Sequence, residues 1–279
     1  MDPVSQLVTG VAAYARLYLR LVYSRIRSQM QYRVSFLLDT AGSFIANFVD
    51  LAALMVMFTQ ARSLGGWSLG EIAFLYGLSS VSFALHELFQ GGYDNDVFAL
   101  YVQRGMFDQM LIRPLPVPFQ MFTEYFVLRR LGRMTQGLLA FVLGVALAQP
   151  HWTLGKLAYL PMVMVGGAVF FLAISIAGCT LCFWTVQSTE VVNIFTYGGT
   201  TMLQYPLTIY QEWMQKFFVY VLPMAFINYF PTLYFLDKAD PFRLPPFVPF
   251  LSPMVCAIVF LLSLRVWGLG VAHYASTGS

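Results

Sequence analysis

The side chains of this sequence that could carry out chemistry are few, and their spacing does not form a reactive site. Cys179 and Cys182 have the spacing Cys-x-x-Cys, but they fall in an apolar run with no cation nearby, where thiols pack as small apolar groups. His86 and Glu87 begin the zinc-binding pattern His-Glu-x-x-His, but Gln90 stands where its second histidine would be. We therefore expect a structural role for the thiols, an ion pair at His86 and Glu87, and no catalytic or metal site.

The composition indicates where these residues must sit. Only 10% of the 279 residues are charged, against roughly 25% in soluble proteins, while 58% are hydrophobic. The phosphate-binding pattern Gly-x-x-x-x-Gly-Lys-Ser/Thr is missing, and no region is polar enough for a soluble nucleotide-binding domain. The net charge of +3 is too small and too spread out to suggest nucleic-acid binding, and we expect no signal peptide. The chain is predicted to be an all-α protein that crosses a membrane several times.

Six apolar segments are long enough to cross a bilayer core of about 30 Å at roughly 1.5 Å per helical residue. The expected spans are Val34–Gln60, Glu71–Gly91, Arg130–Ala148, Leu157–Val186, Val191–Tyr210 and Phe250–Gly270. With both termini inside, eleven of the 16 Lys and Arg residues lie on the cytoplasmic side and five outside, which is the direction that the positive-inside rule favours. All three lysines are among the five, a bias that the sequence alone does not explain.

Polar side chains inside the spans are candidates for function, because placing them in lipid is costly. Asp39 and Asp50 share a face of the first span, with small residues between them and Asn47 beside them. This face favours close packing of helices, and a pathway-lining face is the alternative. Asp39 is expected to pair with an arginine near the inner side, such as Arg130 or Arg133. The fifth span is polar at its centre. The predicted pathway residues are Asn47, Asp50, Thr200 and Gln204.

Two segments outside the spans also carry patterns. Residues 1–33 place apolar side chains at spacings of three and four with arginines opposite, which predicts an amphipathic helix on the membrane surface. That helix is either a topology anchor or a contact for a partner. Between the last two spans, Pro223 and Pro231 divide the apolar stretch Phe217–Leu236 into pieces too short to cross the membrane. We expect short re-entrant helices there, acting as an outer gate, with an interfacial aromatic belt as the alternative.

The loop after the second span holds the clearest local pattern. Its segment Met106–Ile112 places Phe107, Met110 and Leu111 on one face of a short helix. Gly105 permits a tight turn before this segment, and Pro114 ends it. Because the segment has nothing evident in its own chain to pack against, we expect the apolar face to meet a soluble partner. Charged residues at the rim would set the register of that contact, and they are Arg104, Asp108 and Arg113.

This loop resembles that of the permease subunits of ABC-2-type bacterial exporters. The match reads Arg104-Gly105-Met106-Phe107-Asp108, then Met110-Leu111 and Arg113-Pro114-Leu115, with Met106 where the family commonly has threonine. The C-terminal Trp267-Gly268-Leu269-Gly270, His273-Tyr274 and Ser276-Thr277-Gly278 are similar to one bacterial branch of these permeases. The order of interfacial helix, six spans and re-entrant helices is similar as well.

The resemblance implies a single permease domain over residues 1–279, without catalytic activity of its own. Its parts would be residues 1–33 (interfacial helix), 34–91 (first two spans), 92–129 (cytoplasmic coupling loop), 130–210 (spans three to five), 211–249 (outer re-entrant region) and 250–279 (last span and tail). It also implies a second permease protomer, identical or different, and a location in the bacterial inner membrane with both termini cytoplasmic.

In such permeases the loop forms a coupling helix that docks on a separate pair of ATPase subunits, which hold ATP and Mg; no cofactor is expected on this chain. The implied contact residues are Arg104, Gly105, Met106, Phe107, Asp108, Met110, Leu111 and Arg113. Aromatic, weakly charged spans suit export of a hydrophobic or amphipathic drug, lipid or peptide. The alternative function is an ion-coupled secondary transporter that uses Asp39 and Asp50, although no internal repeat is visible.

Overall fold

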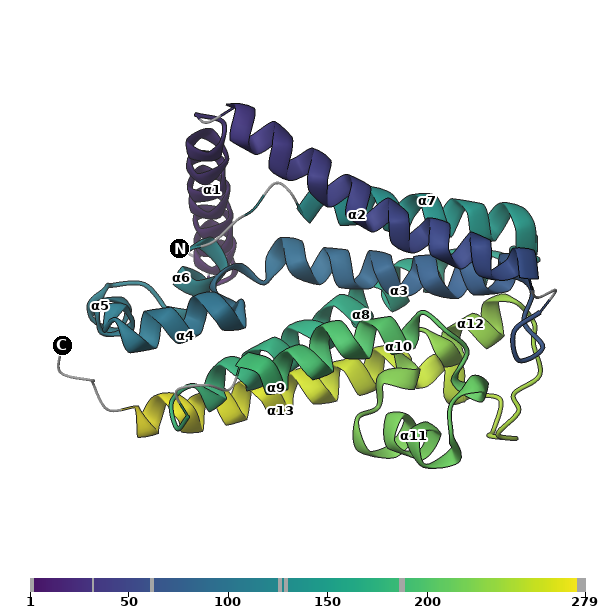
Figure 1. Ribbon diagram of the computed structural model, residues 1–279. Coiled ribbons are helices and arrows are strands. Elements are labelled where there is room, and N and C mark those ends of the chain that lie inside the picture. The colour runs from purple at the N-terminus through teal and green to yellow at the C-terminus, as the bar shows by residue number, and fades with distance from the viewer. Residues whose placement is uncertain are drawn as a thin grey trace.

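The chain folds as a bundle of long helices with shorter elements at its two ends, as Figure 1 shows. This computed structural model describes residues 3–31, 33–60, 63–124, 127, 130–185 and 189–274. Within them, five helices are long and apolar enough to cross a membrane. They are Thr40–Phe58 within α2 (Arg33–Gln60), α3 (Leu69–Phe89), α7 (Leu131–Ala148), α8 (Leu154–Leu181), and Val248–His273, which contains α13 (Ser252–His273).

The expected fifth span, Val191–Tyr210, is wrong in its extent. Among the described residues of this region, continuous helix covers 189–203, as α9 (Thr189–Asn193), a π turn (Ile194–Gly198) and α10 (Gly199–Leu203). At 1.5 Å per residue this is about 22 Å, too short for a bilayer core. A sixth candidate span instead is the pair Glu212–Val221 and Met224–Phe235, which is bent by 77°.

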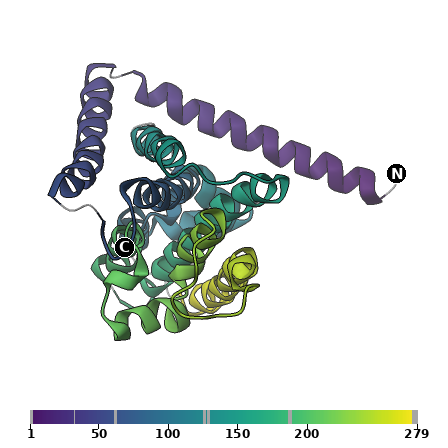
Figure 2. The same ribbon diagram turned by 90° about the vertical axis from the view of Figure 1, so that its right-hand side faces the viewer.

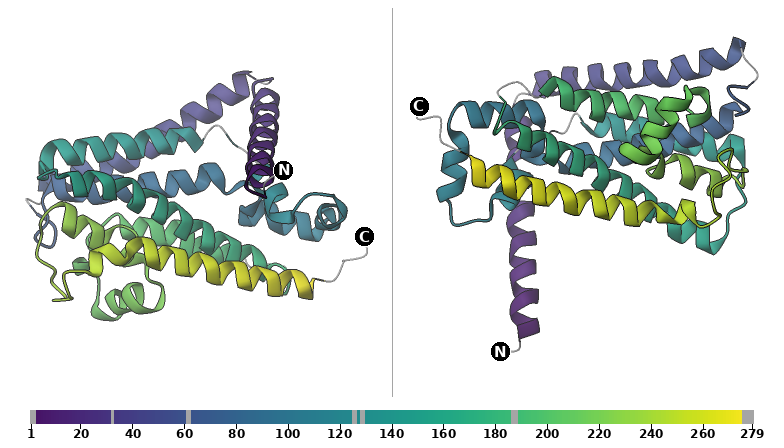
Figure 3. Two further views of the ribbon diagram at one scale, coloured as in Figure 1. Left: turned by 180° about the vertical axis from the view of Figure 1, so that it is seen from behind. Right: turned by 90° about the horizontal axis from the view of Figure 1, so that it is seen from below.

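α3 is the central helix, and glycines bring α7 against it. Of its apolar window 83% is buried, whereas the window in α2 is 6% buried. A Cβ atom at Gly77 would collide with the backbone of Phe141, and one at Gly144 with that of Phe74. Such small residues let two membrane helices approach until their backbones touch. α13 lies along α8, as the view from behind and below shows (Figure 3).

α1 (Pro3–Gln29) lies across one end of the bundle and projects beyond it (Figure 2). It contacts α6 (Val117–Glu124) through the Tyr14 and Phe119 rings, 5.1 Å apart, and through an Arg25–Glu124 ion pair at 3.2 Å. α4 (Asn95–Gln103), α5 (Met106–Ile112) and the C-terminal end of α13 lie at this same end (Figure 1). We call it the α5 end.

The end of the bundle opposite the α5 end holds the bent pair of helices and the three lysines. The break falls at Pro223, as predicted, and is followed by α12 (Tyr229–Phe235). The expected break at Pro231 is wrong, because this proline lies in the first turn of α12, where no intrahelical N–H bond is lost. α11 (Glu212–Lys216) is the start of the first helix of the bent pair.

All three lysines of the sequence pair with carboxylates at this end. Lys156 bonds Asp237 at 2.7 Å and the Phe235 carbonyl at 3.0 Å, which fixes the end of α12 to the start of α8. Lys238 bonds Glu71 at 2.7 Å and so fixes the same segment to α3. The remaining pair, Lys216 with Glu212, lies within α11.

Candidate functional site

A cavity of about 240 Å³ lies between α2, α3, α7 and the α9–α10 segment, and polar side chains from all of these helices line it. The wall residues that matter below are Asp50, Tyr76, Phe83, Arg133, Gln136, Tyr197, Thr200, Gln204 and Tyr205. We call it the central cavity. It brings together three predicted pathway residues from distant parts of the sequence, Asp50, Thr200 and Gln204. The side chains of the fourth, Asn47, and of Asp39 lie outside the described residues.

Hydroxyl and amide groups of the central cavity are held by local bonds. The Thr200 hydroxyl donates to the Thr196 carbonyl at 2.7 Å, one turn back in the same helix, and its lone pairs stay available to accept. The Gln136 amide donates to the Tyr76 hydroxyl, which joins α7 to α3 across the cavity wall.

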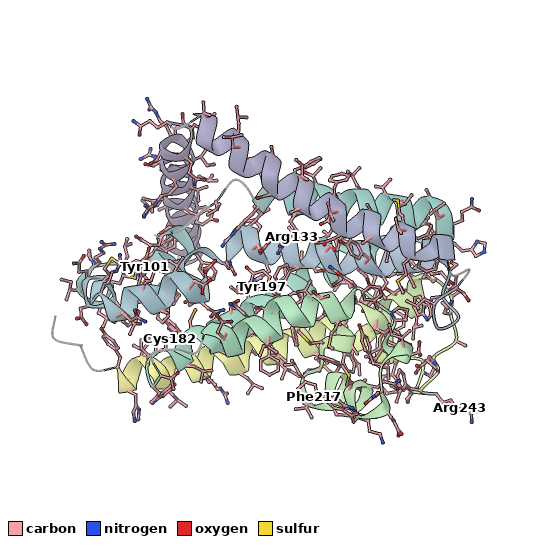
Figure 4. The ribbon with its side chains drawn as sticks, viewed as in Figure 1. Tyr101, Arg133, Cys182, Tyr197, Phe217 and Arg243 are labelled. Carbon is pink, nitrogen blue, oxygen red and sulfur yellow. The ribbon has the colours of Figure 1, made fainter. Side chains whose placement is uncertain are left out.

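The positive charge of the cavity is already neutralised. Arg133 bonds the buried Glu87 carboxylate at 2.8 Å, and Tyr197 donates to the same oxygen at 3.4 Å. The guanidinium also lies over the Phe83 ring, 5.2 Å from its centroid, and over the Tyr197 ring, at 5.7 Å; Figure 4 labels Arg133 and Tyr197. This confirms an ion pair at Glu87. His86 lies instead with its Nε2 3.3 Å from the Ser175 hydroxyl.

Other charges near the C-terminal third of α3 are paired in the same manner. Arg130 bonds Asp94 at 2.6 Å and the Glu87 carbonyl at 2.6 Å. The two arginines at the start of α7 thus bind the end of α3. By contrast, Asp50 has no ion-pair partner within the described part of the chain. Its carboxylate is exposed at the cavity wall.

α5 is a helix over Met106–Ile112, as predicted, but two of the three residues of its expected docking face lie inside the protein. Phe107 is 0% exposed and Met110 4%, so two of the three apolar residues face their own chain. The Phe107 ring lies 5.0 Å from that of Tyr274, 5.2 Å from that of Phe183 and 5.6 Å from that of Phe98. We call these rings, together with Trp267 at 6.2 Å, the aromatic seat of α5.

The turns around α5 follow the sequence prediction. Gly105 has φ +65°, a left-handed conformation that disfavours a side chain. Arg113 is extended before Pro114, which ends the helix. Gln120 of α6 donates to the carbonyls of Met110 and Leu115, both at 2.8 Å. The segment is therefore fixed on both sides of its C-terminal end.

The opposite face of α5 is free within the chain. Leu111 is 43% exposed and Ile112 84%, and the side chains of Arg104 and Arg113 are exposed near them. Asp108 lies beside Tyr274, whose pKa is raised to about 12 by burial and by this carboxylate. The sequence periodicity was correct, but it could not say which face turns inward. The C-terminal sequence motif could have indicated the inward face, because its Trp267 and Tyr274 form part of the aromatic seat.

These features define a multi-pass membrane protein with a polar cavity among its helices and a short helix held at one end. A sequence model of the family described as "ABC-2 family transporter protein" matches residues 44–278. The chain therefore belongs to the ABC-2 transporter family, as the resemblance implied, and is the membrane subunit of an ABC transporter. Permeases of this family are generally non-catalytic, and the family implies an ABC ATPase as a partner. A comparison with curated proteins finds no match.

Proposed function

We propose that the chain is the transmembrane subunit of an ATP-driven exporter of hydrophobic or amphipathic molecules in a bacterial inner membrane. A separate pair of ATPase subunits supplies the energy, holding ATP and Mg, and a second permease protomer, identical or different, completes the pathway. The α5 end and both termini face the cytoplasm, in accord with the eleven arginines assigned to that side. α1 lies on the lipid surface.

The observation that carries this proposal is the two-faced arrangement of α5. One face is buried in the aromatic seat, and the other presents Leu111, Ile112 and flanking arginines. A helix of 7 residues is too short to be stable alone, so the seat must hold it for a partner. Leu111 and Ile112 replace Phe107 and Met110 as the apolar contacts with the ATPase, and Arg104, Asp108 and Arg113 form the rim.

The seat also gives a route for force. Phe98 belongs to α4, Phe183 follows the end of α8, and Trp267 belongs to α13. Because well-packed side chains transmit displacement rather than absorb it, a push on α5 shifts the ends of α8 and α13. α8 packs on α3, which lines the central cavity.

The bent pair contacts the α10 segment, which forms part of the cavity wall. Asn228, before α12, donates to the Leu203 carbonyl at 2.5 Å and so caps α10. Met224 packs where a side chain at Gly199 would collide with it. Thr200 and Gln204 lie in and directly after α10, so a shift of the bent pair and a change of the cavity wall occur together. This supports the bent pair as a re-entrant outer gate.

The experiment is co-purification of the permease with its ATPase, expressed from the neighbouring reading frame that carries a Walker A pattern. Leu111→Asp should abolish or strongly reduce recovery of the ATPase, because it puts an unpaired charge into an apolar contact. Leu100→Asp on α4 is the matched control, since Leu100 is also 43% exposed, and it should leave recovery unchanged. Equal recovery with wild type and Leu111→Asp would contradict the assignment of α5. Absence of any such ATPase partner would contradict the function itself.

A further inference from the structure

The central cavity has an excess negative charge, and this charge is the basis for assigning a ligand. Asp50 is the acidic and Arg133 the basic side chain of its wall. The guanidinium of Arg133 is bound by Glu87 at 2.8 Å, so its positive charge is neutralised within the protein. Asp50 has no counter-ion in the described part of the chain and is exposed at the wall. Inside a membrane protein, such a carboxylate favours a cation beside it.

Aromatic rings surround this charge. Tyr76, Phe83, Tyr197 and Tyr205 line the same wall from α3 and from the segment around α10. The faces of such rings attract cations and accept flat or apolar groups. Phe83 and Tyr197 already receive the Arg133 guanidinium in this manner, at 5.2 and 5.7 Å. Arg133 therefore already makes, within the cavity, the contact between a cation and aromatic rings that a cationic ligand would make.

The remaining wall is suited to an organic rather than a bare metal cation. Thr200 contributes a hydroxyl that already donates its proton within the helix, and Gln204 contributes an amide. No group of three or more His, Cys, Asp or Glu side chains that could hold a metal ion occurs among the described residues. A volume of about 240 Å³ admits a head group with one ring.

We propose that the central cavity binds organic monocations, with Asp50 as the counter-ion and the tyrosine rings as the walls of the site. This inference rests on the proposed transport function and names its substrate class. Because Arg133 is paired with Glu87, Asp50 is the single unpaired acid of the wall, and one carboxylate balances one positive charge on the ligand.

The test measures binding of radiolabelled phenyltrimethylammonium to the full-length permease in nanodiscs, with and without its ATPase. Wild type should bind it saturably, benzenesulfonate should not compete, and a large excess of Na⁺ should not displace it. Asp50→Asn should weaken binding by at least about tenfold, while Asp50→Glu should restore most of it. Glu190→Gln, which removes an exposed acid of α9 outside the cavity wall, is the matched control and should bind as wild type. Tyr205→Leu should weaken binding about threefold, and Tyr205→Phe should not.

The proposal is overturned if no saturable binding is found, if Asp50→Asn binds as well as wild type, or if benzenesulfonate competes. Displacement by Na⁺ would also overturn it, in favour of ion-coupled transport. These outcomes do not depend on the ATPase. A permease that recruits its ATPase through α5 but binds no monocation refutes only the ligand class. A permease that binds the monocation but recruits no ATPase refutes the ATP-driven function instead.

Discussion

Phe107→Ala tests whether α5 is held by its aromatic seat or by its ATPase partner. The side chain is 0% exposed, and three rings lie with centroids 5.0, 5.2 and 5.6 Å from its own. Truncating a buried phenylalanine costs about 3–5 kcal/mol, a range that includes the loss of aromatic pairing. Because α5 is 7 residues long and lies outside the long helices, this loss should fall on the local stability of α5 and leave the spans folded.

The assay is amide hydrogen exchange of the permease alone in nanodiscs. At about 1.4 kcal/mol per factor of ten, protection of the α5 amides should fall about 100-fold to 4,000-fold, or to the unprotected rate. Amides of α3 should exchange as in wild type. Ile112→Ala is the control on the same helix, since Ile112 is 84% exposed, and its α5 amides should keep their protection.

The two variants should separate in a second measurement. Ile112→Ala should weaken ATPase recruitment without loosening α5, whereas Phe107→Ala should weaken recruitment because α5 is loosened. Unchanged exchange of α5 in Phe107→Ala would refute the seat. Loss of protection throughout the bundle would show that the seat belongs to the global core and not to a local unit.

Three further perturbations follow from the packing and the charges. Gly77→Ala or Gly144→Ala should lower the thermal midpoint in detergent, at a cost of about 1–3 kcal/mol, while Gly42→Ala, with open space around it, should not. Arg133→Met should leave the buried Glu87 carboxylate without its ion-pair partner and lower the free energy of unfolding by about 3–5 kcal/mol. Adding Glu87→Gln should recover part of that loss in the same thermal assay. The pKa of Asp96 is raised above its usual 3.8, by burial first and then by Asp94 and Glu190, so its ionisation destabilises the fold. The fold is therefore more stable at acid pH, where Asp96 is protonated, and it loses stability as pH rises through the raised pKa. Asp96→Asn should raise the thermal midpoint at pH 7 and leave it unchanged near pH 3.

The sequence was sufficient for features that depend on local periodicity. Long apolar runs predicted most of the spans, and the i, i+3 and i+4 spacing predicted α5 with its left-handed Gly105 and its stop at Pro114. The polar residues Asp50, Thr200 and Gln204 were selected only because polar groups are costly in lipid, and the structure places all three on one cavity.

It was not sufficient where the outcome depends on which surfaces meet. The fifth span failed because a run of threonines and glycines has no strong period, and a π turn with the bend before Pro206 shortens the helix. Local periodicity does not show that one face of α5 is buried, because the partners of that face, Phe183 and Trp267, lie far along the chain. The α3–α7 contact was missed for a similar reason, since its glycines gain meaning only when the two helices are aligned.

The contact between the α5 loop motif and the C-terminal motif gives a push on α5 a second route to the membrane helices. If the loop acted alone, force would enter through its chain neighbours, α4 toward α3 and α6 toward α7. Phe107 instead touches Trp267 on α13 and Tyr274 just after it, at the far end of the chain. α13 packs along α8 over the length of the bundle, and its other end follows directly on the segment after the bent pair. The last span is therefore a direct mechanical connection from α5 toward the segment after the bent pair, and the central cavity, which no α13 residue lines, lies beside that connection rather than on it.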